Sequence, residues 1–264
     1  LKSEKKSPIP ILSFPCISLM GVTVKELVQS SKLQARGMQS VAERIPSGAV
    51  VSMMDLSVEA EAFGSPIRME DNEIPAVIGS LVHSQAEANA LQIPAVGSGR
   101  TGKYIEAIRM ASESINDRPV FAGMIGPFSL AGRLMGVTEA LMNCYDEPDM
   151  VHTVLRKATD FLVKYAQAYK DSGADGIVMA EPLTGMLSPA LAEEFSETYV
   201  KEIIDAVQDD NFIVIYHNCG NNTILMIDSL LRTGAYAYHF GNSIEMLQML
   251  EKVPSDVIVM GNID

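Results

Sequence analysis

A histidine and a cysteine two residues apart are the clearest chemical signal in the sequence. His217 and Cys219 stand at the end of an apolar run and are followed by a glycine. In a β-strand, residues i and i+2 point to the same face, so the two side chains would lie about 6 to 7 Å apart along the backbone. An imidazole nitrogen with a soft thiolate favours zinc over magnesium or calcium. The alternative is a structural pair, with a buried cysteine and a hydrogen-bonded core histidine.

Two ligands do not complete a zinc site, because structural sites use four and catalytic sites use three plus an open position. Glu181 and Cys16 each close a predicted strand and are candidates for a further ligand. A residue beyond Asp264 is a third candidate. Glu181 could equally be a carboxylate bonded to a neighbouring strand or a helix N-terminus. Cys16 is a weaker candidate, because in a closed barrel of strands it would lie across the barrel from His217.

Asp55 follows the apolar run 50–54 and is a candidate for binding or catalysis. A lone carboxylate at a strand end could orient a cationic or amine-bearing substrate or act as a base. The alternative is an aspartate that caps a loop. His239 has no metal partner at a recognisable spacing, so we interpret it as an ordinary strand residue.

Residues 97–103 match the pattern G-x-x-x-x-G-K of phosphate-binding loops. The next residue is Tyr104, so the hydroxyl that would bind Mg²⁺ is missing. The preceding residues 92–96 contain a proline and make a poor strand. We therefore expect a flexible loop followed by a helix over residues 104–114.

The elements that must position these residues alternate between short apolar runs and longer amphipathic stretches. One stretch, 149–172, follows a proline, ends at a glycine and repeats apolar residues at helical spacing. The runs are mostly apolar on successive positions, as expected for parallel strands that are covered on both sides. Seven runs can be counted: Ile9 to Pro15, Ala49 to Asp55, Val120 to Gly126, Ala174 to Glu181, Phe212 to Asn218, Ala235 to Asn242 and Val257 to Asp264.

Repeated strand-then-helix units predict an α/β fold with a parallel sheet, either open and doubly wound or closed into an eightfold barrel. Seven strands, with the chain ending on the seventh, favour a (β/α)8 TIM barrel that lacks its last strand and helix in this chain. We expect one domain over residues 1–264, with an insertion at about 56–119.

Composition limits the class of function. The chain has 264 residues, 47% of them apolar and 20% charged, which suits one large buried core. A net charge of −13 would repel nucleic acid and anionic membrane surfaces. The three cysteines cannot form a dense disulfide framework, and no apolar run is long enough to span a membrane. We expect a cytoplasmic protein, and the sequence leaves a homodimer open.

Several segments together resemble the uroporphyrinogen decarboxylase superfamily, from about Ile9 onward. The segment 52–56 around Asp55, with 62–64, resembles the family's second strand. The segment 121–129 is similar to its glycine-proline motif, and 173–181 to its fourth strand. The closing residues 261–264 resemble the family motif G-N-[IL]-D-P.

The resemblance implies one of two chemistries. Decarboxylases of this superfamily carry an arginine-rich loop after strand one, and here residues 14–21 contain no arginine. The zinc-dependent methylcobamide:thiol methyltransferases carry H-x-C in strand five, which His217 and Cys219 match, and a further cysteine expected after Asp264. This branch implies zinc, a thiol substrate and a methylated corrinoid on a partner protein. Glu181 would occupy the open zinc position or accept the thiol proton, and Asp55 would orient the substrate. The alternatives are a tetrapyrrole decarboxylase and a non-catalytic binding barrel.

Overall fold

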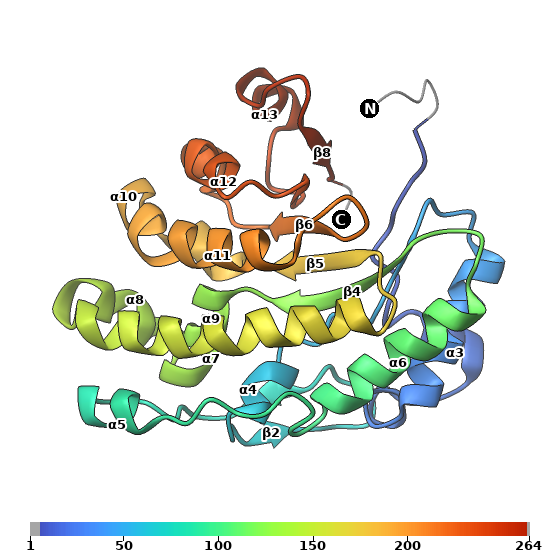
Figure 1. Ribbon diagram of the computed structural model, residues 1–264, viewed down its shortest axis with the longest axis horizontal. Helices are drawn as coiled ribbons and strands as arrows, with labels where there is room; N and C mark the ends of the chain where they lie inside the picture. Colours follow the sequence, from blue (N-terminus) through green and yellow to red (C-terminus); the bar gives the residue numbers. More distant parts are fainter. Residues whose placement is uncertain (1–5, 263–264) are drawn as a thin grey trace.

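The computed structural model describes residues 6–262 and is built around a curled parallel sheet (Figure 1). The strands of this sheet follow one another in chain order, and each is parallel to its neighbours. They are β1 (Val50–Val51), β4 (Val120–Ile125), β5 (Gly176–Ala180), β6 (Ile213–Asn218), β7 (Ala237–Phe240) and β8 (Ile258–Met260). Six of the seven predicted runs are therefore strands, although Asp264 lies outside the described residues.

The first run, Ile9 to Pro15, was predicted as a strand, and that prediction is wrong. The segment lies beside β1, where Gly48 N donates to Pro8 O (2.7 Å) and Met54 N donates to Ser13 Oγ (3.4 Å). Pro8 and Pro10 have no N–H to donate, so a regular ladder cannot form. Ile9 still packs against the interior of the sheet, which explains the strand-like pattern.

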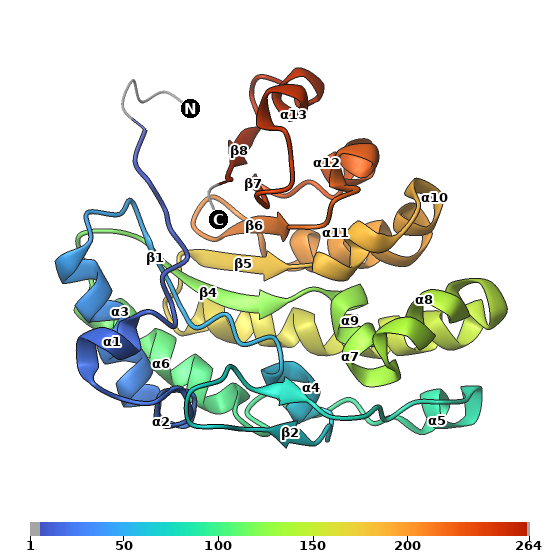
Figure 2. The ribbon, with the colours of Figure 1, turned by 180° about the vertical axis from the view of Figure 1, so that it is seen from behind.

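Helices cover the outer face of the sheet, with α9 along β4 and β5 (Figures 1 and 2). The predicted helix 149–172 is confirmed as α9 (Pro148–Asp171), which has a proline in its first turn. None of the described helices has both the length and the apolar character needed to cross a bilayer. The others outside residues 56–119 are α1 (Cys16–Met20), α2 (Val24–Val28), α3 (Ser31–Arg44), α7 (Pro127–Met135), α8 (Val137–Asp146), η1 (Pro182–Met186), α10 (Pro189–Ala192), η2 (Glu193–Glu197), α11 (Thr198–Val207), η3 (Thr223–Met226), α12 (Ile227–Arg232) and α13 (Met246–Lys252).

Between β1 and β4 the chain first runs along one side of the molecule, where α4 (Val58–Ala62), β2 (Ile67–Arg68) and α5 (Gln85–Ala90) lie, and then enters α6 (Thr101–Ser114), which packs against α3 (Figure 2). The two short strands of this segment, β2 and β3 (Ala76–Val77), pair antiparallel, apart from the main sheet. The helix predicted over 104–114 is present and begins at Thr101.

The concave side of the sheet is filled with apolar side chains. Val51, Phe121, Val178 and Ile215 form one buried cluster there, and Ile9 packs against it. Ile9, Val51, Val178 and Ile215 are among the residues that line a cavity of only about 10 Å³ there. In parallel α/β sheets the reactive groups usually stand at the carboxyl edge, toward which the strand arrows point in Figure 2.

Candidate functional site

Two histidines face each other at the carboxyl edge of the sheet. His217 lies near the end of β6, and its register partner on β7 is His239. Their Nδ1 atoms are 2.7 Å apart, and the ring centroids are 4.7 Å apart with a 32° angle between the planes. Residue spacing does not connect His239 with His217, because the two residues are 22 positions apart and only the register of the strands joins them.

Both imidazoles are neutral near pH 7. Burial, with a smaller contribution from His239, lowers the pKa of His217 to about 4. Burial also lowers the pKa of His239. A neutral imidazole is the form that binds a metal ion, so His217 meets the first requirement of a ligand.

Cys219 follows β6 directly and is the exposed cysteine of the three. The turn that carries it is fixed by the buried Asn218, whose Oδ1 accepts hydrogen bonds from Gly220 N and Thr223 Oγ1, both at 2.9 Å. Gly241, after β7, lies against this turn. A Cβ added to it would stand 2.6 Å from Cys219 Cβ, so the close approach of the two strand ends requires glycine.

Glu181 follows β5 and is fully buried. Its Oε1 accepts hydrogen bonds from Ser129 N in α7 (2.8 Å) and from Thr184 Oγ1 (3.1 Å), while Oε2 has no partner. Burial raises the pKa of Glu181 to about 8. Gly126 makes room for the carboxyl group, because any Cβ there would overlap Oε2. Glu181 therefore contacts a helix N-terminus, which was the structural alternative considered from the sequence.

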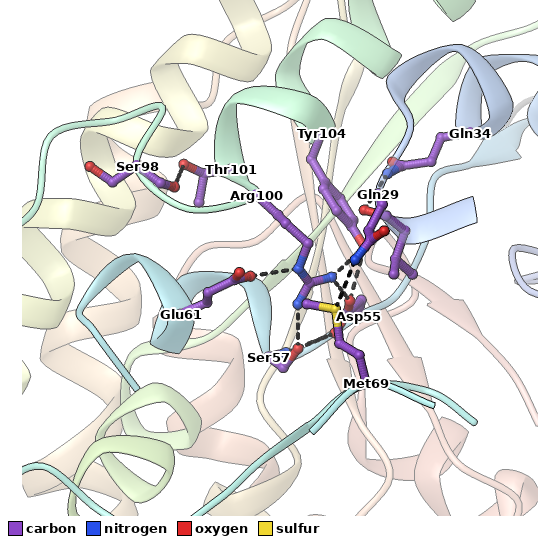
Figure 3. A network of polar contacts seen from close by, with 11 residues as sticks. Gln29, Gln34, Asp55, Ser57, Glu61, Met69, Ser98, Arg100, Thr101 and Tyr104 are labelled. Atoms are coloured by element: carbon purple, nitrogen blue, oxygen red, sulfur yellow. Dashed lines mark hydrogen bonds and ion pairs between the residues drawn. The ribbon is translucent and has the colours of Figure 1, made fainter. Parts of the chain in front are cut away.

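Asp55, a few residues after β1, belongs to a buried polar network with Ser57, Arg100 and Tyr104 (Figure 3). Its Oδ2 pairs with Arg100 Nη1 and accepts from Tyr104 Oη (3.0 Å). Its Oδ1 accepts from the backbone N (3.1 Å) and the Oγ (2.6 Å) of Ser57. Arg100 also pairs with Glu61 (2.5 Å). Asp55 thus bonds to these side chains rather than to either histidine.

Arg100 is the residue of this network that sequence reasoning missed. It lies inside the G-x-x-x-x-G-K segment and immediately precedes α6. That segment is a loop closed by Thr101, whose Oγ1 accepts from Gly97 N (3.0 Å) and donates to Ser98 O (2.6 Å). The interpretation as a loop before a helix is consistent with this geometry. Nothing in the spacing points from Arg100 to Asp55, 45 residues earlier in the chain.

The structure brings together some of the predicted site residues and separates others. His217 and Cys219 lie at one strand end, as predicted. Cys16, proposed as a strand-end ligand, instead begins α1, where it is buried against Gly37 in α3, and burial raises its pKa to about 11. Among residues 6–262, no cluster of three or more histidine, cysteine or acidic side chains could hold a metal ion. The two donors are therefore an incomplete ligand set.

Comparison with known proteins gives two kinds of relative. The methylcobamide:CoM methyltransferase MtbA of Methanosarcina mazei is 29% identical over 279 residues, covering all of this chain and 80% of the relative. The uroporphyrinogen decarboxylase of Flavobacterium johnsoniae is 26% identical over 195 residues, covering 71% of this chain and 57% of the relative. Both are enzymes by name, which supports the prediction of an enzyme.

A solved structure shows the same fold. The methyltransferase from Methanosarcina mazei superimposes with a TM-score of 0.89 over 99% of this chain and 79% of its own, at 23% sequence identity. The family model for uroporphyrinogen decarboxylase (URO-D) matches residues 15–264. The resemblance drawn from the sequence is confirmed, and the chain belongs to the uroporphyrinogen decarboxylase family.

Proposed function

We propose that this protein is a zinc-dependent methyltransferase that moves a methyl group from a methylated corrinoid to a thiol. The observation that carries the proposal is the pair His217 and Cys219, one nitrogen and one sulfur donor at the carboxyl end of β6. The full-length similarity to a methylcobamide:CoM methyltransferase supports it. The absence of arginine from residues 14–21 argues against a substrate with many carboxylates.

The donor chemistry fits zinc. His217 is neutral at pH 7 and Cys219 is exposed, so both can reach a metal ion at the sheet edge. We propose that a third ligand comes from outside residues 6–262. When bound, zinc would lower the pKa of a substrate thiol, so that the nucleophilic thiolate forms near neutral pH.

Asp55 and Glu181, the other predicted site residues, would act without touching the substrate, by holding the strand ends in place. Asp55 and Glu181 are enclosed, with 4% and 0% exposure. Direct contact with substrate would require their hydrogen bonds to open. We propose that Asp55 holds the end of β1 through Arg100, and that Glu181 holds the start of α7 against β5. Asp55 would then orient the substrate indirectly, by fixing the shape of the edge.

We further propose that the curled sheet is the larger part of a (β/α)8 barrel, formed by residues 1–264 as one domain with an insertion at about 56–119. The methyl donor would be a corrinoid carried by a partner protein. That partner would dock over the carboxyl edge, because the filled interior offers no other route to the zinc ligands. A homodimer is compatible with this arrangement, since docking uses only that edge.

The test is zinc content and methyl transfer in the full-length protein, purified without chelator. We expect about one zinc per chain and methyl transfer from methylcobalamin to coenzyme M. His217→Ala and Cys219→Ser should each lose both. His83→Ala is the matched control, because His83 is exposed and its hydrogen bonds go to Ser80 and Glu87, away from His217 and Cys219.

Two results would contradict the proposal. One is a wild-type protein without zinc, in which His217→Ala changes neither the zinc content nor the methyl transfer. A non-catalytic barrel predicts this result. The other is decarboxylation of uroporphyrinogen at an enzymatic rate, which would identify the second chemistry of the family.

A further inference from the structure

We infer that His239 is a positioning residue for the zinc site, which accepts a hydrogen bond from His217 and so fixes that ring for metal binding. This inference rests on the proposed function, because it assumes that His217 is a zinc ligand. It concerns a residue that the ligand pattern of the sequence does not include.

The distance between the two rings indicates a hydrogen bond rather than two ligands on one ion. Two nitrogens bound to tetrahedral zinc at 2.0–2.1 Å would be about 3.3 Å apart. The Nδ1 atoms of His217 and His239 are 2.7 Å apart, which fits a short N–H···N bond. In addition, His217, Cys219 and His239 do not gather as a three-donor group within the described residues.

A hydrogen bond between two Nδ1 atoms requires that one carries hydrogen and the other does not. If Nδ1 of His217 is the donor, its Nε2 keeps a free lone pair for the metal ion. Metal-binding histidines regularly donate their second N–H to a fixed acceptor, which sets the tautomer and the orientation of the ring. Here the acceptor is the Nδ1 of His239.

His239 is well placed to hold this position. It lies on β7 between its register partners His217 on β6 and Met260 on β8. His239 also lines the small apolar cavity inside the sheet, together with Ile215 and Val178. The acceptor is therefore carried by a strand rather than by a mobile loop.

The experiment compares two substitutions at this position in the full-length protein. His239→Leu removes the acceptor, whereas His239→Asn can place an amide oxygen near the position of Nδ1. Zinc affinity is measured by competition with a chromophoric chelator. We expect His239→Leu to weaken zinc binding about 10- to 100-fold, and His239→Asn to restore most of that loss. Melting temperatures of both variants show whether the fold is kept.

X-ray absorption of the zinc-loaded protein gives the number of nitrogen ligands and separates the two roles. We expect the same number in the wild type and in His239→Asn. One nitrogen fewer in both variants would make His239 a direct ligand and overturn the inference. Equal zinc affinity of the wild type and His239→Leu would also overturn it, while leaving the proposed function intact. A wild type without zinc would instead remove the proposed function and this inference together.

Discussion

At the scale of single residues, the guanidinium of Arg100 is a charged group held in the core, because it is only 3% exposed. Burial acts to lower its pKa, but the neighbouring Asp55, Tyr104 and Glu61 together outweigh this effect and raise the pKa above its usual value. The side chain therefore stays charged in the core. A buried charge of this kind is tolerated only while its partners remain in place.

Asp55→Asn tests this dependence. The substitution keeps the shape of the side chain but leaves Arg100 paired with Glu61 alone. We expect the free energy of unfolding to fall by about 3 kcal/mol, measured by urea denaturation. Asp71→Asn is the control, since Asp71 makes only an exposed pair with Lys25 at 3.8 Å, and surface pairs contribute little. Equal effects of the two variants would show that the buried pair adds no stability.

Glu59 predicts a specific pH dependence of stability. Burial raises the pKa of this carboxyl group to about 7, although Ile125 N donates to its Oε1 (3.0 Å). Oε2 has no partner, and the charged groups Asp55 and Arg100 and the phenols Tyr165 and Tyr169 act on the site. The folded protein therefore binds the proton more tightly than the unfolded chain, whose carboxyl has a pKa near 4.5.

The stabilisation from this proton is complete below pH 4.5 and is lost as the pH rises through 7. Glu59→Gln cannot titrate. Between pH 5 and pH 8, we expect the free energy of unfolding of the wild type to fall by about 3 kcal/mol through this group. The Glu59→Gln variant should not show this fall. Urea denaturation across this range measures the change, with the exposed Glu251→Gln as control. Parallel curves for wild type and Glu59→Gln would contradict the assignment.

The candidate site could be predicted from the sequence only where its members are close along the chain. His217 lies on β6 and Cys219 follows that strand in the next turn, so two residues of chain are enough to put both at the same strand end. His239 joins them through strand register, and Arg100 reaches Asp55 from the start of another helix. Neither contact has a signature in residue spacing.

At the scale of elements, α5 is joined to the rest of the molecule by a lysine. Lys157 on α9 extends its Nζ to three carbonyl oxygens at the end of α5: Ala88 (2.8 Å), Asn89 (2.6 Å) and Leu91 (2.7 Å). The last carbonyls of a helix have no partner within it, and a cation stabilises that end.

Lys157→Met removes these three bonds while keeping most of the apolar stem. We expect faster backbone hydrogen exchange over residues 85–92, because the end of α5 is released, and a loss of about 1.5–3 kcal/mol of local stability. Exchange measured by mass spectrometry tests this directly. Lys164→Met, on an exposed part of the same helix, is the matched control. Unchanged exchange over 85–92 would show that apolar packing alone holds α5.

Most elements could be predicted because their apolar pattern agrees with their burial. The α9 helix has both the spacing and the end signals, and the central strands are buried on both faces. The run Ile9 to Pro15 packs against the sheet without the backbone donors that a strand needs. Pro10 within the run and Pro8 just before it have no N–H to donate, although Ile9 and Ile11 pack like strand residues. Burial alone therefore does not define a strand.

At the scale of the whole molecule, we expect the two ends of the curled sheet to have different roles, one in stability and the other in chemistry. Phe121 lies near the amino end of β4, in the filled interior, and is 4% exposed. His217 and Cys219 lie at the opposite end of the sheet. In folds of this kind the amino end contributes mainly stability, while the carboxyl end carries the reactive groups.

Two substitutions at the two ends should therefore have opposite effects. Phe121→Ala creates a cavity and should lower the free energy of unfolding by about 3–5 kcal/mol, with zinc affinity unchanged in the protein that remains folded. Gly241→Ala forces a methyl group against Cys219, so zinc affinity should fall about tenfold or more, because ligand geometry tolerates little displacement. The overpacked turn should cost only about 1–3 kcal/mol in stability.

Urea denaturation and chelator competition on the same samples give both quantities, the free energy of unfolding and the zinc affinity. If Phe121→Ala weakened zinc binding as much as Gly241→Ala does, the interior and the edge would behave as one cooperative unit, and the division between a stabilising end and a reactive end would not hold.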